Sequence, residues 1–124
     1  MTALAVVARF SLQSGFDADE HPAISNNAAN AAITRRIDWI HIPALDRTDD
    51  TFYAPLAKLD TKGARIYLGA IHNMATLKDR VAAARQFLPE FGLAAYCGFG
   101  RTPPSDMPKV LQDHVDAVEV AGLA

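Results

Sequence analysis

The sequence predicts a single α/β domain, spanning residues 1–124, in which four strand–helix units build a parallel sheet. Short apolar runs alternate with helical patterns at intervals of roughly 30 residues, the size of a βαβ unit. Turns from helix to strand are short and plain, whereas loops from strand to helix collect polar and titratable residues. This asymmetry predicts that functional residues lie at the carboxyl ends of the strands.

The strands are expected at residues 4–12, 37–42, 65–71 and 93–97. The first is rich in Val, Ala and Phe, and the third reads RIYLGAI. The second reads IDWIHI and is stopped by Pro43. Its apolar residues do not alternate cleanly, which is typical of a strand covered on both faces.

Four helices are expected, one after each strand, over residues 22–35, 51–59, 76–88 and 105–121. Asp49 or Asp50 can cap the second helix. Thr76 and Asp79 resemble a capping box at the start of the third. Helical spacing places an apolar face inward on the last two helices, namely Leu77, Val81, Ala84 and Leu88 on the third and Met107, Leu111, Val115 and Val118 on the fourth.

Composition excludes several classes of function. The twelve Lys and Arg residues are scattered and the formal net charge is -2, so no basic surface for nucleic acid is expected. No run approaches the ~20 apolar residues of a membrane span. Arg9 interrupts the apolar opening segment, which does not have the order of a secretory signal. A single cysteine cannot form an internal disulfide, and we expect a reducing, cytoplasmic setting.

Three candidate reactive residues follow the predicted strands. Cys97 begins the Gly-rich turn CGFGR and is either a nucleophile or thiolate ligand, or a small buried hydrophobe. His41 shares a strand face with Pro43 and is either a general base or a core histidine. His72 either binds substrate or shuttles a proton, or it is only a helix-entry residue in a solvated loop.

Charged residues near the same strand ends are candidates for binding substrate. Asp46 can act as a carboxylate beside one of the histidines, and Arg47 can bind substrate in the same loop, although a solvated loop is the alternative. Arg101 can clamp a substrate carboxylate, or pair with Asp46 or Asp106. Trp39 is expected to form core or pocket wall.

The stretches IDWIHIP, RIYLGAIH, FLPEFGL and AYCGFGR resemble the carboxyl-terminal half of the catalytic barrel of cobalamin-independent methionine synthases. The resemblance implies strands five to eight of an eight-stranded TIM barrel, with a parallel sheet equivalent to its second half. It also implies that Cys97 and Gly98 match the family's Cys-Gly pair, whose cysteine ligates zinc.

The other zinc-ligand positions of that family are replaced in this chain. The His-x-Cys segment reads Ser11-Leu12-Gln13, and the glutamate position is Pro43. Zinc needs three or four such ligands, so the sequence predicts no zinc site, and no cofactor is identified. Ser11 and Gln13 can hydrogen-bond a ligand at the vacated positions instead.

Three functions follow from this resemblance. The first is a small-molecule enzyme that works without zinc, in which His41, Cys97, His72 and Asp46 are catalytic and Arg101, Gln13, Ser11, Arg47 and Trp39 bind substrate. The second is zinc-dependent methyl or alkyl transfer to a thiol, with the missing ligands supplied by a partner. The third is a non-catalytic half-barrel for binding or assembly.

Four strands in barrel order cannot close, and the outer strands leave open edges. We therefore expect a homodimer, or a partner chain, that completes eight strands. The alternatives are a flat four-stranded α/β layer and a fragment of a longer protein.

Overall fold

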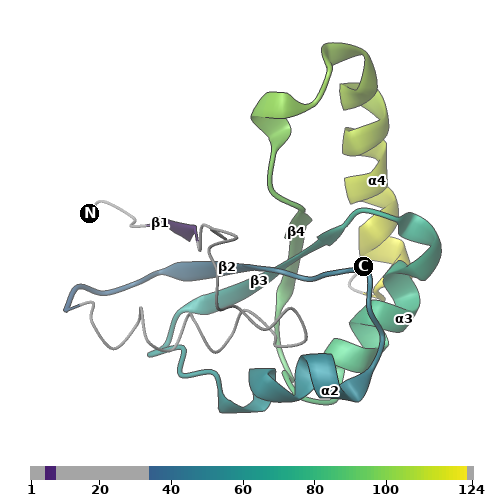
Figure 1. Cartoon of the computed structure of the whole chain (residues 1–124). Helices are drawn as coiled ribbons and strands as arrows, with labels where there is room; N and C mark the ends of the chain where they lie inside the picture. Colours follow the sequence, from purple (N-terminus) through teal and green to yellow (C-terminus); the bar gives the residue numbers. More distant parts are fainter. Residues whose placement is uncertain (1–4, 8–33, 123–124) are drawn as a thin grey trace, which may run out of the picture.

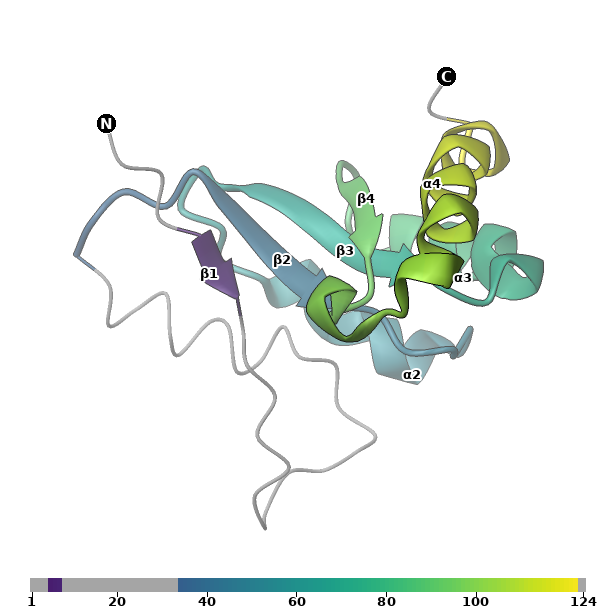
Figure 2. The ribbon, with the colours of Figure 1, turned by 90° about the horizontal axis from the view of Figure 1, so that it is seen from above.

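The computed structural model describes the backbone of residues 5–7 and residues 34–122. It shows a parallel sheet with strand order β1-β2-β3-β4 (Figure 2). The strands are β1 (Ala5–Val7), β2 (Trp39–Pro43), β3 (Arg65–Ile71) and β4 (Gly92–Ala95). Strands that follow one another in the sequence are therefore also neighbours in the sheet. The prediction of an α/β protein with a parallel sheet is confirmed.

The helices follow the strands, as Figure 1 shows. The first described helix is α2 (Asp50–Tyr53), continued by the 3-10 helix η1 (Ala54–Lys58). Beyond β3 comes α3 (Met74–Arg85), and beyond β4 come η2 (Phe99–Arg101), η3 (Pro104–Asp106) and α4 (Met107–Val120). Most of the helix predicted over residues 22–35 lies outside the described residues, but residues 34 and 35 are not helical.

The N-terminal cap of α2 is as predicted, whereas the cap of α3 is not. The Asp49 carboxylate accepts a hydrogen bond from the backbone N–H of Phe52, 3.0 Å away. Helix α3 begins three residues earlier than the Thr76 capping box implied, after Asn73 in a left-handed conformation with φ 39°. Thr76 therefore lies within the helix and not at its cap, and its hydroxyl donates to Asp46 at 2.5 Å.

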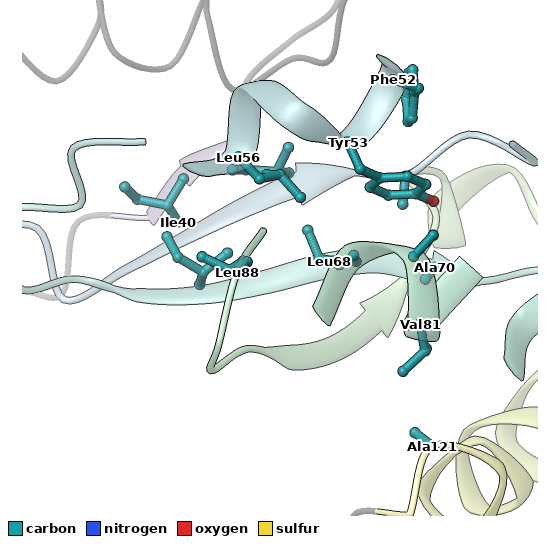
Figure 3. Packing of buried hydrophobic residues seen from close by; sticks show 14 of the residues in the cluster. Ile40, Phe52, Tyr53, Leu56, Leu68, Ala70, Val81, Leu88 and Ala121 are labelled. Atoms are coloured by element: carbon teal, nitrogen blue, oxygen red, sulfur yellow. The ribbon is translucent and has the colours of Figure 1, made fainter. Parts of the chain in front are cut away.

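One face of the sheet carries the core. Alternation along β2 and β3 places five apolar side chains on this face, namely Ile40, Ile42, Ile66, Leu68 and Ala70. Helix α2 and η1 cover them with Phe52, Tyr53 and Leu56, which Figure 3 shows against β2 and β3. The predicted inward face of α3 is confirmed, since Leu77, Val81, Ala84 and Leu88 are all buried. Each fully buried large side chain contributes about 1.5–3 kcal/mol to folding.

The opposite face of the sheet is covered much less by the described residues. Trp39 and His41 of β2 and Tyr67 of β3 lie on it and are only half-buried. The sequence prediction that β2 is covered on both faces is therefore wrong for the described part of the chain. The apolar residues do not alternate cleanly because aromatic side chains occupy the second face, although these side chains are only half-buried.

The apolar stripe of α4 formed by Leu111, Val115 and Val118 is a second correction. These side chains were expected inward but are exposed to 59%, 61% and 43%. The core side chains of α4 are instead Ala117 and Ala121, near its carboxyl end, where the helix runs beside α3 (Figure 1). The helix therefore has an apolar surface wider than the strip that the rest of the described chain covers.

Within the described residues, no helix combines the length and the apolar character that crossing a membrane requires.

Candidate functional site

The parallel strands bring the loops after β2, β3 and β4 to one edge of the sheet. Asp46 and Arg47 follow β2, and His72 follows β3. Cys97 and Arg101 follow β4, which ends at Ala95, two residues earlier than predicted. The predicted site residues therefore share an edge, but they fall into separate groups.

The first group surrounds a hollow of about 690 Å³ on the less covered face of the sheet. This volume is within the range of small-molecule sites. The hollow brings together three predicted site residues, His41, Cys97 and Trp39. Its other lining residues were not predicted as site residues and are Tyr67, Leu93, Ala94, Ala95, Tyr96, Gly98, Phe99 and His114. None of the described residues that line it is Asp, Glu, Lys or Arg.

His41 reaches across the sheet over a glycine. A Cβ atom on Gly69 would lie only 2.6 Å from His41 Nε2 and 3.2 Å from the Ala95 carbonyl oxygen. Tyr67 repeats this arrangement one strand further on, since a Cβ on Gly92 would lie 2.5 Å from the Tyr67 ring. Glycine at both positions leaves room for the ring of the preceding strand.

The Nε2 atom of His41 is buried and has no hydrogen-bond partner among the described residues. Burial lowers the pKa of His41, and the nearby Ala95 carbonyl raises it by less. The imidazole is therefore neutral at neutral pH. A buried nitrogen without a partner costs about 1–3 kcal/mol, which a ligand that hydrogen-bonds to Nε2 would recover.

Aromatic rings form the walls of the hollow. Trp39 and Tyr67 meet edge to face with centroids 6.4 Å apart. Phe99 lies 5.7 Å from the ring of His114, which comes from α4. The Nδ1 of His114 donates to the carbonyl of Val110 at 2.7 Å.

The side chain of Cys97 is exposed at the margin of this hollow. The alternative of a buried small hydrophobe is therefore wrong, because β4 ends before it and the chain has already left the sheet.

The second group is centred on Arg80, a residue of α3 that is only 1% exposed. Its guanidinium donates to the carbonyls of Ala70 at 2.9 Å and Asn73 at 3.1 Å, and also to the carbonyl of His72. It lies 3.5 Å from the Asp46 carboxylate. Arg80 thus joins the loops after β2 and β3. Sequence reasoning missed it because a lone arginine within a helix gives no signal of burial.

His72 belongs to this second group. Its Nε2–H donates to the Ala44 carbonyl at 2.7 Å, and its ring meets Tyr96 with centroids 4.9 Å apart. Burial lowers the pKa of His72, and the positive charge of Arg80 lowers it further, against the opposing effect of the Ala44 carbonyl. The His72 ring is neutral. Through Ala44 and Tyr96 it connects the loop after β3 with the loops after β2 and β4.

Asp46 and Arg47 also contact protein groups. Asp46 accepts hydrogen bonds from Thr76 and Asn73, which hold its carboxyl pKa below the ordinary value. Arg47 forms two hydrogen bonds with Asp49, at 2.7 and 2.8 Å, and its guanidinium lies 5.1 Å from the Phe52 ring centroid. Arg47 therefore supports the start of α2.

The remaining predicted residues lie apart from both groups or outside the described chain. Arg101 is exposed within η2 and does not line the hollow. Ser11 and Gln13 are outside the described residues. In the part of the chain that the structure describes, no three His, Cys, Asp or Glu side chains gather closely enough to hold a metal ion.

The sequence held signals for two of the lining residues that were not predicted, Tyr67 and Phe99. Tyr67 pairs with His41 in the β2–β3 register and so shares its face of the sheet. Phe99 lies in the CGFGR turn beside Cys97. His114 gave no such signal, because its approach depends on the path of α4.

Comparisons of the chain with models of known protein families, with curated proteins and with solved structures found no match.

Proposed function

We propose that the hollow over β2, β3 and β4 binds a small organic molecule and that His41 exchanges a proton with it. The observation that carries this proposal is the buried Nε2 of His41, which has no partner among the described residues and borders the hollow. A neutral imidazole in that position is a general base at neutral pH. The reaction class is acid–base chemistry that needs no zinc.

The lining restricts the ligand. Four aromatic side chains contribute to the walls, and none of the described residues that line the hollow is charged. A charged carboxylate or phosphate would lose its hydration without gaining an ionic partner. We therefore propose an uncharged ligand with an aromatic or other apolar body and one polar hydrogen, donated to His41. Cys97 contacts it from the margin.

Asp46 and His72 have positioning roles in this proposal. Both are hydrogen-bonded within the Arg80 group, which meets the lining of the hollow where the His72 ring packs against Tyr96. Arg47 has the same role through Asp49.

We further propose that the domain consists of four strand–helix units and forms half of a TIM-type barrel, similar to the methionine synthase barrel named above. The sequential parallel strand order supports this, as does the clustering of core residues on one face of the sheet. The less covered face, with its aromatic side chains, corresponds to the barrel interior. We retain a cytoplasmic setting as part of the proposal, because the single thiol is free.

The binding test compares two probes that differ by one hydroxyl, 4-methylphenol and toluene. Both should shift amide NMR signals of the lining residues. The hydroxyl should give 4-methylphenol about fivefold tighter binding, the equivalent of roughly 1 kcal/mol for one hydrogen bond.

The matched variants are His41→Phe and His114→Phe, which make the same change at two positions of one hollow. His41→Phe should abolish the preference for the hydroxyl, and His114→Phe should retain it. Absence of shifts at the lining residues, or an equal effect of both variants, would overturn the proposal.

Hydrolysis of 4-nitrophenyl acetate tests proton transfer, and it is measured in a Cys97→Ser background so that the thiol cannot take up the acetyl group. Water and the ester give 4-nitrophenol, acetate and a proton, with His41 taking the proton from the attacking water and releasing it to solvent. Loss of the rate above background in His41→Phe supports an enzyme. Binding of 4-methylphenol without any such rate favours the non-catalytic binding subunit.

A further inference from the structure

We infer that a second copy of this chain completes the hollow by joining its β1 to β4 of the first copy, and its β4 to β1, in one closed parallel sheet. This inference rests on the proposed function, since the hollow is the site that the second copy would enclose.

The first observation concerns the sheet edges. Among the described residues, β1 and β4 are the outer strands and each has a partner on one side only. Unpaired backbone groups along an outer strand favour pairing with another strand. Because all four strands are parallel, a twofold axis along the strands would place β4 of each copy beside β1 of the other in the same direction.

No other simple pairing of two copies gives every outer strand a second neighbouring strand. Joining β4 to β4 about a perpendicular axis makes one antiparallel junction and leaves both β1 edges unpaired. The parallel arrangement makes two equivalent junctions and brings the strand number to eight, at which a sheet can close into a barrel.

The second observation is the apolar stripe of Leu111, Val115 and Val118 on α4, the helix that follows the edge strand β4. Their exposure leaves on the order of 300 Å² of apolar surface, comparable to the largest patches on ordinary monomers, which are often functional. The unpaired strand and the uncovered helix stripe thus belong to neighbouring elements of the chain that contact each other.

The area required for a stable dimer also favours a second copy. A stable interface takes about 800 Å² from each partner. The stripe alone is too small for this, but twofold closure uses the β1 edge, the β4 edge and the stripe of each copy together. It also sets the half-buried Trp39 and Tyr67 opposite the same residues of the partner.

Among the described residues, the lining of the hollow comes from β2, β3, β4, the following loop and α4. In this proposal the partner supplies the wall that faces away from the sheet. Closure would surround the ligand and shield His41 from water.

The test measures the mass of the full-length protein by analytical ultracentrifugation over a range of concentrations. We expect a dimer for the wild type and a monomer for Val115→Asp, because a carboxylate in the stripe could not be desolvated. Val120→Asp is the matched control, since Val120 is exposed at 38% on the other side of α4 and should leave the dimer intact.

Hydrogen exchange distinguishes the two ways of pairing. Parallel closure should slow amide exchange in both β1 and β4 as the dimer forms, whereas β4–β4 pairing slows it in β4 alone. Because this measurement uses the wild type, it remains decisive if Val115→Asp fails to fold.

A wild type that stays monomeric, a dimer that survives Val115→Asp, or protection of β4 without β1 would overturn the inference. The binding of 4-methylphenol and toluene tests the proposed function independently of the dimer. A monomer that binds 4-methylphenol through His41 refutes the closure and supports the site, whereas a dimer that binds neither probe supports the closure and refutes the site.

Discussion

His41 occupies the space that a side chain on Gly69 would need. The two residues lie on adjacent strands, and a Cβ on Gly69 would be 2.6 Å from Nε2. The position of the imidazole at the hollow therefore depends on the absence of a side chain on β3.

Gly69→Ala should displace His41 and destabilise the domain by about 1–3 kcal/mol, the usual cost of overpacking. The new methyl group would press on the ring and, at 3.2 Å, on the Ala95 carbonyl. Urea unfolding measures the loss of stability. The preference for 4-methylphenol over toluene should also disappear in this variant, because His41 is displaced. Gly100→Ala is the control, because nothing lies within 4 Å of its added Cβ, and equal behaviour of the two variants would contradict the packing argument.

Arg80→Met should be severely destabilising, by about 3–5 kcal/mol. It keeps most of the side-chain volume but removes the guanidinium donors to the carbonyls of Ala70, Asn73 and His72 and leaves Asp46 without its cationic neighbour. Arg80→Lys should rescue little, because an ammonium cannot reproduce the planar set of donors.

The control for that experiment is Arg36→Met. Arg36 pairs with Asp38 at 3.0 Å, but its side chain is 82% exposed, and such a pair contributes at most about 1 kcal/mol. Equal unfolding midpoints for Arg80→Met and the wild type would show that Arg80 does not join the loops.

Acidification should weaken the fold near pH 6 through the histidines. Burial lowers the pKa of His41 and of His72 below the value of about 6.5 expected in the unfolded chain. The unfolded state then binds more protons, so stability is complete above about pH 6.5 and declines as the pH falls toward the native pKa values. The lowered carboxyl pKa values of Asp46 and Asp49 add a separate loss below about pH 4.

Urea unfolding at pH 7.5 and at pH 5.5 measures this histidine effect. His41→Phe should lose less stability between the two pH values than the wild type, because one of the two groups is removed. An unchanged difference would mean that His41 is not buried as the neutral form.

Alkylation of Cys97 by iodoacetamide should be complete in the native protein, because the side chain is exposed and is the only thiol. Since Cys97 lines the hollow, saturating 4-methylphenol should slow the reaction, and this can be followed by intact mass. The rate in urea, with and without the probe, is the control. Protection that persists in urea would show that the probe acts on the reagent rather than on the site.

The local patterns predicted the sheet and one helix face well. The ends of β2 and β4 agree with the sequence to within two residues, and all four apolar residues named on α3 are buried. Both results depend on short-range periodicity, which the chain carries in its residue order. The placement of reactive groups at one edge follows from the parallel topology in the same way.

Features that depend on contacts between distant segments were not predicted. The burial of Arg80 results from carbonyls of a strand and a loop that converge on it, and no spacing in α3 shows this. The stripe of Leu111, Val115 and Val118 has the periodicity of a buried face, yet periodicity cannot show whether a cover comes from the same chain. His114 lines the hollow only because α4 returns beside β4.

The loops at this edge of the sheet differ in how they are held. Arg80 ties the loops after β2 and β3 to helix α3, whereas the backbone hydrogen bonds of the segment after Cys97, which lines the hollow, are local. Examples are the bonds from Arg101 N–H to the Gly98 carbonyl at 2.8 Å and from Thr102 N–H to the Phe99 carbonyl at 3.1 Å. Substitutions between residues 98 and 104 can therefore reshape one wall while the fold keeps its stability. Selection for a new ligand would find its most tolerant positions in that segment.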